Sequence, residues 1–383
     1  MMLMTEDGPA PSTTASTASG CTTLPVGFCM RRAAITNDAT AQRFLEQSVA
    51  AFERAVSQTC VREWTGILAG LPVRLRIAGD VCYPLVTRAL AHLATPIASS
   101  AELTVRVWDT ASTGHEMASP PWPREAFGPH GLVQGFNDTR FMTAYDLGTH
   151  ALSLLDQVGG QALFWTQDAT TLPPWEHAAP LKRILHRWLR SRGLQLAHAA
   201  AVGLSSGGAL IVGKSGSGKS TTALHLLREG FGYIGDDYVV LARSPQPTAH
   251  SLYCTAKLHD ATRTRYPHLL PVFDTPASSA LPKVVAFMQA DRDGPLLGDT
   301  PVQAVFLPTI THSRDSWIEP GSAAEAVAAI APSTILQLPG AGQTDLTQLA
   351  EFIRLTRTYR LHLGTDLPGV AALIRTTLEE AGA

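Results

Sequence analysis

The sequence predicts an α/β protein whose second half is a mixed sheet flanked by helices, preceded by a smaller α+β module. Two observations carry this prediction. Residues 208–230 read as a short apolar strand, a glycine-rich loop and an amphipathic helix, in that order. Residues 73–79 and 103–109 alternate apolar and polar side chains at period two, which is typical of half-buried strands.

Composition limits the classes of protein to consider. The chain has 383 residues, which suggests two or three domains, and 45% apolar against 16% charged residues argues against wholesale disorder. A formal net charge of −2 gives no global field to attract nucleic acid or anionic membranes, so neither is expected as a partner. The 5 cysteines form no C-x-x-C pair, so neither a zinc site nor a disulfide framework is indicated. Without a long apolar run or a secretory signal, we expect a cytoplasmic protein.

Three segments are expected along the chain. Residues 1–22 are rich in Ser, Thr, Ala and Gly and predict a disordered tail, because they offer little apolar surface to bury. Residues 23–175 predict the α+β module with antiparallel strands, which helps to select or dock a substrate. Residues 176–383 predict the second domain, and the boundary falls in the Pro-containing stretch TTLPPWEH.

Shorter elements follow from local patterns. YPLVTRALAHLATP predicts a short helix ended by Pro96, and FMTAYDLGTHALSLLD predicts a strand, a turn and a strand. The Pro- and Gly-rich residues 118–131 predict a loop. Apolar side chains from Leu181 to Leu189 share one helical face, and Gly193 is expected to end that helix.

The glycine-rich loop satisfies the complete pattern G-x-x-x-x-G-K-[ST]. Its glycines let the backbone curl and direct N–H groups at phosphate oxygens, and the helix that follows adds the positive end of its dipole. Lys219 is expected to reach the β- and γ-phosphates of ATP, and Ser220 to offer its hydroxyl to Mg²⁺. A chance Gly/Ser-rich loop is the alternative, which the strand–loop–helix context disfavours. The predicted nucleotide-binding residues are Gly213, Lys214, Ser215, Gly216, Ser217, Gly218, Lys219, Ser220 and Thr221.

A pair of carboxylates follows the loop. Asp236 and Asp237 lie between two short apolar segments, 17 and 18 residues after Lys219. Adjacent carboxylates at a strand junction are costly to bury unless they meet a cation or a transferable proton. We therefore expect one of them to bind Mg²⁺ and the other to accept a hydroxyl proton from a phosphoryl acceptor. A solvated Gly-Asp turn is the alternative interpretation.

These residues resemble the catalytic domain of HPr kinase/phosphorylases, which carries a His, a strand, the P-loop, a helix and an Asp pair at fixed spacing. The resemblance covers about residues 181–242, where His198 precedes Gly213 by 15 residues. It is strongest to HPr-kinase-like proteins found beside lasso-peptide and other peptide-modification genes. It implies that Asp237 is the general base, Asp236 a magnesium-associated carboxylate and His198 a histidine near the transferred phosphate. A core histidine in an apolar run is the alternative for His198.

The resemblance also implies an activity. ATP and Mg²⁺ would be the cofactors, the acceptor would be a serine of a peptide or protein, and a homo-oligomer is implied. Thr221 stands where bacterial HPr kinases carry Glu, and their Gly/Arg-rich downstream segment is not found, which argues against HPr itself as the acceptor. The open alternatives are a free-serine kinase, an enzyme like phosphoenolpyruvate carboxykinase and a non-catalytic ATP-binding scaffold.

Five further cations are candidates for phosphate contacts, although each is also readily explained as a surface charge. They are Lys257, Lys283, Arg263, Arg265 and Arg314.

Overall fold

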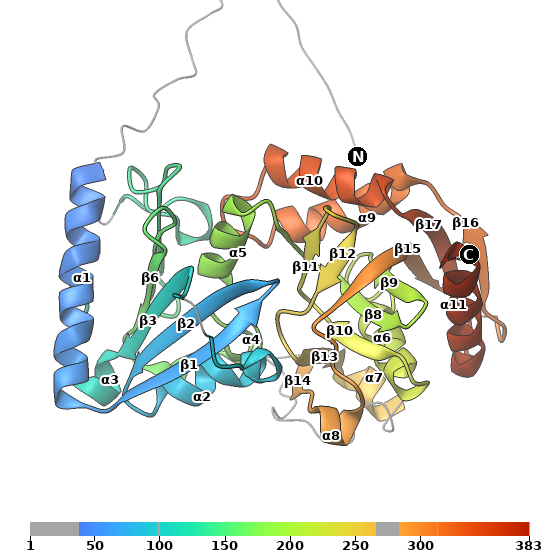
Figure 1. Ribbon diagram of the computed structural model, residues 1–383, viewed down its shortest axis with the longest axis horizontal. Helices are drawn as coiled ribbons and strands as arrows, with labels where there is room; N and C mark the ends of the chain where they lie inside the picture. The colour runs from blue at the N-terminus through green and yellow to red at the C-terminus, as the bar shows by residue number, and fades with distance from the viewer. Residues whose placement is uncertain (1–37, 98–99, 124, 266–282, 312, 383) are drawn as a thin grey trace, which may run out of the picture. The chain divides into compact units, whose positions relative to one another are not determined.

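The computed structural model describes residues 38–97, 100–123, 125–265, 283–311 and 313–382, so the predicted tail at 1–22 lies outside the described residues. Residues 36–383 form one compact unit. Within it, the described residues build two large mixed sheets flanked by helices (Figure 1). The expected mixed α/β architecture is thereby confirmed.

The first sheet has six strands in the order β1-β2-β3-β6-β5-β4. Its strands are β1 (Val61–Leu68), β2 (Leu71–Ala78), β3 (Leu103–Asp109), β4 (Phe141–Asp146), β5 (Ala151–Asp156) and β6 (Gln161–Thr166). The expected strand–turn–strand at β4 and β5 is confirmed as an antiparallel hairpin. The expected antiparallel strands are present, but the sheet is mixed, because β3 pairs in parallel with both β2 and β6. Period-two alternation reports that a strand is half buried, but not the direction of its neighbour.

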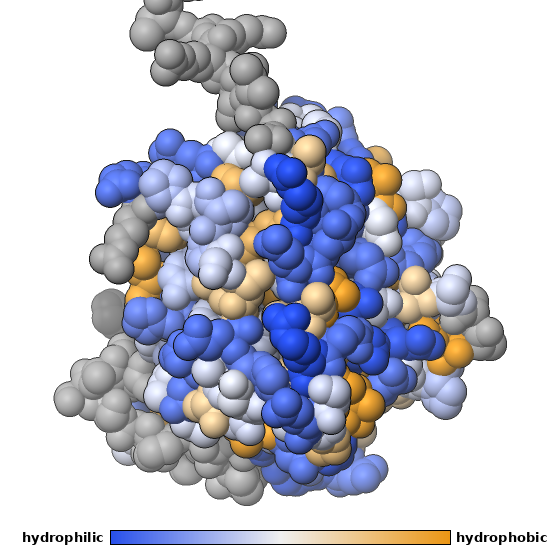
Figure 2. Space-filling model, turned by 90° about the vertical axis from the view of Figure 1, so that its left-hand side faces the viewer, coloured by the Kyte–Doolittle hydropathy of each residue, from blue (hydrophilic) through white to orange (hydrophobic). Residues whose placement is uncertain are grey.

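Helix α1 (Asp38–Gln58) covers one face of this sheet and is an element that the sequence analysis does not assign. Phe44 and Phe52 on its inner face belong to a buried cluster with Trp108 of β3 and Leu152 of β5. Its outer face is polar, and Figure 2 shows it as a hydrophilic band on this side of the molecule. The helix therefore shields apolar strand residues from water.

The second sheet contains nine strands. The order β10-β8-β9-β15-β12-β11-β7 is extended by β17, which pairs with β15, and by β16, which pairs with β17. Only β9–β15 and β15–β17 are parallel among the described pairs. The strands are β7 (Gln195–Ala197), β8 (Ala200–Leu204), β9 (Gly207–Ile211), β10 (Gly232–Gly235), β11 (Val239–Ala242), β12 (Thr248–His250), β15 (Asp299–Ile310), β16 (Trp317–Pro320) and β17 (Arg357–Leu363).

Helices cover both faces of the second sheet. Ala209 and Ile211 of β9 pack toward α6 (Lys219–Arg228) and α11 (Leu367–Gly382). The alternate residues Leu210 and Val212 pack in the cluster that holds α9 (Ala323–Ile335) and α10 (Gln343–Arg354). An apolar strand buried on both faces explains why the run at 209–212 shows no alternation.

Shorter elements complete the fold. The helix expected from Tyr83 to Pro96 is α2 (Cys82–Thr87), which continues as a 3-10 helix at Arg88–Leu93. A two-stranded sheet is formed by β13 (Thr255–His259) and β14 (Lys283–Phe287). The remaining helices are α3 (Thr110–Thr113), α4 (Pro174–Ala178), α5 (Lys182–Ser191), α7 (Asp260–Arg265), α8 (Ala290–Asp293) and two single 3-10 turns at Pro129–Gly131 and Ala169–Thr171.

Helix α5 begins at Lys182, one residue after Leu181, which the sequence predicts to lie on the apolar face of this helix. Leu181 has a left-handed φ of 57°, so it is the N-cap residue and lies outside the helix. At the other end Gly193 has φ 75°, and the N–H of Leu194 donates to the carbonyl of Leu189 at 3.1 Å. This is a Schellman motif, which confirms Gly193 as the helix stop.

Among the described residues, no helix is long and apolar enough to cross a membrane.

Candidate functional site

The glycine-rich loop connects β9 to α6 and is shaped by its glycines. Gly216 and Gly218 have φ of 81° and 107°, in the left-handed region that glycine tolerates best. A Cβ at Gly218 would lie 2.6 Å from Leu363 Cδ1, so this glycine also permits close packing against β17. Among the described residues, the Ser217 hydroxyl is buried without a hydrogen-bond partner. A buried hydroxyl and the free N–H groups at the start of α6 together fit phosphate oxygens.

Lys219 points back into the loop. Its side chain is buried, and Nζ donates to the carbonyl oxygens of Gly213 at 2.7 Å and Lys214 at 3.1 Å. Burial lowers the pKa of Lys219, against the opposing effect of Asp236, and nearby Lys283 lowers it further. The loop carbonyls are weak partners for an ammonium group, so a bound phosphate would compete well for it.

Asp236 directly follows β10 and faces the start of α6. Its Oδ1 accepts a hydrogen bond from Ser220 Oγ at 3.0 Å, and its Oδ2 accepts one from the backbone N–H of Lys257 at 3.1 Å. Burial raises the pKa of Asp236, and the charge of Asp237 raises it further. A hydroxyl and a buried carboxylate side by side are oxygen ligands of the kind Mg²⁺ takes, so these residues fit that cation.

Asp237 adopts a left-handed backbone conformation with φ 76°. Lys257 Nζ lies 2.5 Å from Oδ2, and His198 Nε2 lies 3.2 Å from Oδ1. Burial alone would raise the pKa of Asp237, but Lys257 and then His198 outweigh it, so the pKa lies well below its usual range. The carboxylate is therefore ionised at neutral pH.

A chain of hydrogen bonds orients the His198 ring. Lys182 Nζ donates to Tyr238 Oη at 3.3 Å, and Tyr238 Oη donates to Gln337 Oε1 at 2.8 Å. The Gln337 amide nitrogen then faces His198 Nδ1 at 3.4 Å. This direction leaves the imidazole proton on Nε2, where it points at Asp237. The main-chain N–H of His198 is held separately, by Thr334 Oγ1 of α9 at 3.0 Å.

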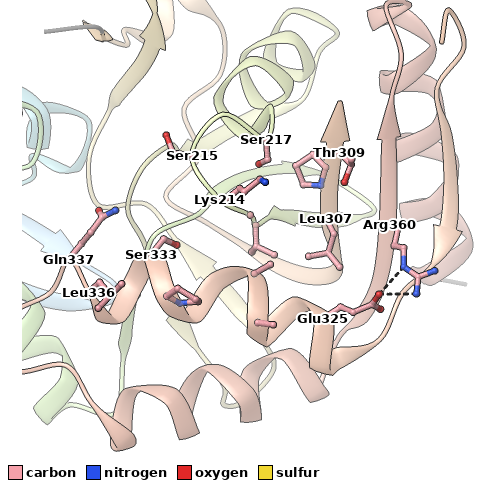
Figure 3. Close-up of a pocket in the computed structure, with 16 residues that line it drawn as sticks. Lys214, Ser215, Ser217, Leu307, Thr309, Glu325, Ser333, Leu336, Gln337 and Arg360 are labelled. Atoms are coloured by element: carbon pink, nitrogen blue, oxygen red, sulfur yellow. Dashed lines mark hydrogen bonds and ion pairs between the residues drawn. The ribbon is translucent and has the colours of Figure 1, made fainter. Parts of the chain in front are cut away.

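Two cavities adjoin the loop. The smaller has a volume of about 90 Å³ and is lined by His198, Lys219, Ser220, Asp236, Asp237 and Lys257, among others. The larger has a volume of about 570 Å³. It is enclosed by the glycine-rich loop, by the C-terminal end of β15 and by α9. Figure 3 shows Lys214, Ser215 and Ser217 on one side of it and Ser333, Leu336 and Gln337 on the other.

The structure brings most of the predicted site residues together around the smaller cavity. Ser215, Gly216, Gly218 and Thr221 line it together with the residues named above. The other predicted loop residues, Gly213, Lys214 and Ser217, line the larger cavity.

The structure places the five additional cations predicted to contact phosphate in different surroundings. Lys257 and Lys283 both line the smaller cavity, and Lys257 contacts a carboxylate instead of reaching freely toward a phosphate. Arg314 is exposed and lines neither cavity. The side chains of Arg263 and Arg265 lie outside the described residues.

Sequence reasoning did not find Lys182, Tyr238 and Gln337. Tyr238 follows the Asp pair directly, but a tyrosine beside an apolar strand gives no signal of a polar role. Gln337 lies 139 residues from its partner His198, and Lys182 lies 56 residues from Tyr238. No local spacing links such residues, so only their meeting in space reveals the chain.

Comparisons with known proteins add little to this geometry. No model of a protein family matches the chain, and no curated protein matches it. Among solved structures, the HPr(Ser) kinase/phosphatase from Coxiella burnetii is similar with 11% sequence identity. The alignment covers 49% of this chain and 99% of that chain, with a TM-score of 0.27. A TM-score this low does not establish a shared fold.

Proposed function

We propose that this protein is an ATP-dependent kinase that transfers the γ-phosphate to a serine hydroxyl of a peptide or protein. The observation that carries the proposal is the meeting, around one cavity of about 90 Å³, of Lys219 and Ser220 with the Asp237–His198 pair. The first two residues belong to a complete nucleotide-binding loop, and the pair supplies an ionised carboxylate aimed at the same space.

The residues divide into three roles. The loop amides and Lys219 bind the phosphates and stabilise charge on the equatorial oxygens, which is most of what this chemistry requires. Ser220 and Asp236 would hold Mg²⁺, which neutralises phosphate charge when bound. Asp237 accepts a hydrogen bond from the acceptor hydroxyl and takes its proton as the oxygen–phosphorus bond forms. The bond from the γ-phosphorus to the bridging oxygen breaks, and ADP leaves with that electron pair.

His198 and Lys257 position the base. Because both hold Asp237 ionised, the carboxylate can accept a proton at neutral pH, although its low proton affinity favours orienting the hydroxyl over removing the proton early. This suits a loose phosphoryl-transfer transition state, in which the nucleophile is little deprotonated when bonding begins. His198 acts through Asp237, and no contact with substrate is required of it.

The acceptor class rests on the motif resemblance. His198, the P-loop and the Asp pair occur at the spacing of HPr kinases, and the likeness is strongest to kinases beside lasso-peptide genes. We therefore propose a ribosomal precursor peptide as the acceptor, and a cytoplasmic homo-oligomer as the enzyme.

Mass spectrometry of candidate acceptors tests the proposal. The protein is incubated with ATP and Mg²⁺ and with a precursor peptide encoded beside its gene, with free serine and HPr in parallel. One added phosphate on the peptide, absent with Asp237→Asn, is the expected result. Modification of free serine alone would make it a small-molecule kinase. Lys219-dependent ATP binding without transfer to any acceptor would favour a scaffold.

A further inference from the structure

The larger cavity has Gly213, Lys214 and Ser217 of the loop on one side, but its other walls have no part in the transfer step described above. Its walls are mainly apolar, and Leu336 at its rim is 71% exposed. The apolar residues that line it are Val212, Leu307, Pro308, Ala328, Ala329, Pro332 and Leu336. A volume of about 570 Å³ is in the range of binding sites for small molecules or single side chains with their backbone.

Two residues connect this cavity to the transfer site. Ser215 lines both cavities. Gln337 lines the larger one and contacts His198, which contacts Asp237 in the smaller one. A molecule bound in the larger cavity therefore lies next to the residues that orient the base.

Lys219 indicates where the γ-phosphate lies. A P-loop lysine reaches the β- and γ-phosphates. Here Lys219 lines the smaller cavity together with Asp237 and His198. The γ-phosphate, and with it the attacking hydroxyl, is therefore expected in the smaller cavity.

The smaller cavity is too small for the residues that flank the acceptor serine. About 90 Å³ holds phosphate groups and a reacting hydroxyl, but not the residues that flank an acceptor serine. Those residues must extend into adjoining space, and the apolar larger cavity adjoins the transfer site, since Ser215 lines both.

We propose that the larger cavity binds an apolar side chain next to the acceptor serine of the peptide. This inference rests on the proposed kinase function and deepens it by naming the acceptor class: a serine flanked by an apolar residue. The ion pair between Arg360 and Glu325, with Nη2 and Oε1 2.8 Å apart, lies on the lining of the same cavity (Figure 3). The charges of this ion pair therefore neutralise each other at the cavity wall.

A cavity-filling variant tests this assignment. Ala329→Leu adds three carbons to the wall of the cavity, and Ala324→Leu makes the same change at an exposed position of the same helix as the matched control. The probe is a library of short peptides with one fixed serine and a degenerate residue on each side, phosphorylated with ATP and Mg²⁺. Affinity for ATP is measured separately by calorimetry.

The expected result is a tenfold or greater preference of the wild type for an apolar residue at one flanking position. Ala329→Leu should lower kcat/KM for the preferred peptides at least tenfold and leave the Kd for ATP within twofold, while Ala324→Leu matches the wild type. If Ala329→Leu weakens ATP binding and leaves peptide selection intact, the cavity holds the nucleobase and this inference is wrong, although the kinase function stands. If the wild type binds ATP but phosphorylates no peptide, the proposed function fails and this inference with it.

Discussion

The carboxylate of Asp237 has both oxygens engaged, one by Lys257 and the other by His198. A carboxylate held from two sides keeps one orientation, and its backbone is set by an uncommon left-handed φ of 76°. Aspartate is among the few non-glycine residues that adopt this conformation readily. The position therefore suits this residue type by conformation as well as by charge.

Replacing Asp237 by Asn keeps the size of the side chain and removes its basicity. We expect the rate of phosphoryl transfer to fall by about 10²–10⁴-fold, the usual contribution of general base catalysis, with ATP affinity little changed. Single-turnover transfer measured by rapid quench gives the rate, and calorimetry gives the affinity. A variant that transfers phosphate at the wild-type rate would remove Asp237 from the mechanism.

The pH dependence of transfer reports on Lys257. In the proposed mechanism the Asp237 base acts only when ionised, so we expect activity to be lost as pH falls through the pKa of Asp237, and Lys257 helps to hold that pKa well below its usual range. Lys257→Met removes the cation, so the acid limb of the kcat profile should move to higher pH. Lys283→Met is the matched control, because this lysine lines the same cavity from β14. Equal profiles for the two variants would contradict the role given to Lys257.

At the scale of the element, α9 has two functions. Thr334 near its C-terminal end holds the backbone of His198, and other residues of the helix form a wall of the larger cavity. Its N-terminus is closed by a capping box in which Ser322 and Glu325 bond each other's backbone N–H groups. Local sequence thus stabilises the helix that orients the site.

Ser322→Ala removes half of this capping box. The free energy of unfolding should fall by about 1 kcal/mol, as for other serine caps. Thermal and urea unfolding followed by circular dichroism measure the change, and Ser313→Ala, in an exposed loop, serves as the comparison. An equal effect of both substitutions would show that the cap contributes nothing specific.

Contacts between the first and second halves of the chain act at the scale of the whole molecule. Buried residues of both halves share one cluster, in which Leu75 and Trp188 lie with Tyr238 and Tyr253. The N–H of Cys254 also donates to the carbonyl of Ala89 at 2.8 Å. The cluster reaches Tyr238, which belongs to the hydrogen-bond chain that orients His198. Packing between the halves therefore supports the site.

One of these contacts is sensitive to pH. His92 Nε2 lies 2.6 Å from Ser251 Oγ, and burial lowers the pKa of His92 to about 4. The unfolded chain, with the usual pKa, binds the proton between about pH 6.5 and 4 while the folded chain does not, so this histidine costs stability as pH falls through that window.

Between pH 7 and pH 5 we expect His92 to reduce the free energy of unfolding by about 2 kcal/mol. His92→Gln should therefore lose less stability than the wild type over this range. Urea unfolding of both proteins at a series of pH values measures the difference. Parallel curves would show that His92 titrates alike in the folded and unfolded chains.

The sequence anticipated those parts of the fold that depend on local pattern. The strand at 103–109, the stop at Gly193 and the strand–loop–helix unit all follow from neighbouring residues, and the structure has each of them. The parallel partners of β3 did not follow, because a strand's alternation is the same beside either kind of neighbour. Nor did α1, whose inner face is completed only by the sheet it covers.

The sequence by itself determined the chemistry available to this protein: a loop shaped for phosphates, a lysine and a serine at its end, and two adjacent carboxylates. Only the tertiary structure decided which of these groups contact one another. It placed Ser220 against Asp236 and Lys257 against Asp237, and it joined His198 to Gln337 across 139 residues. The reason is that the charge state of a buried carboxyl depends on the groups within a few ångströms of it, and distance along the chain says nothing of those.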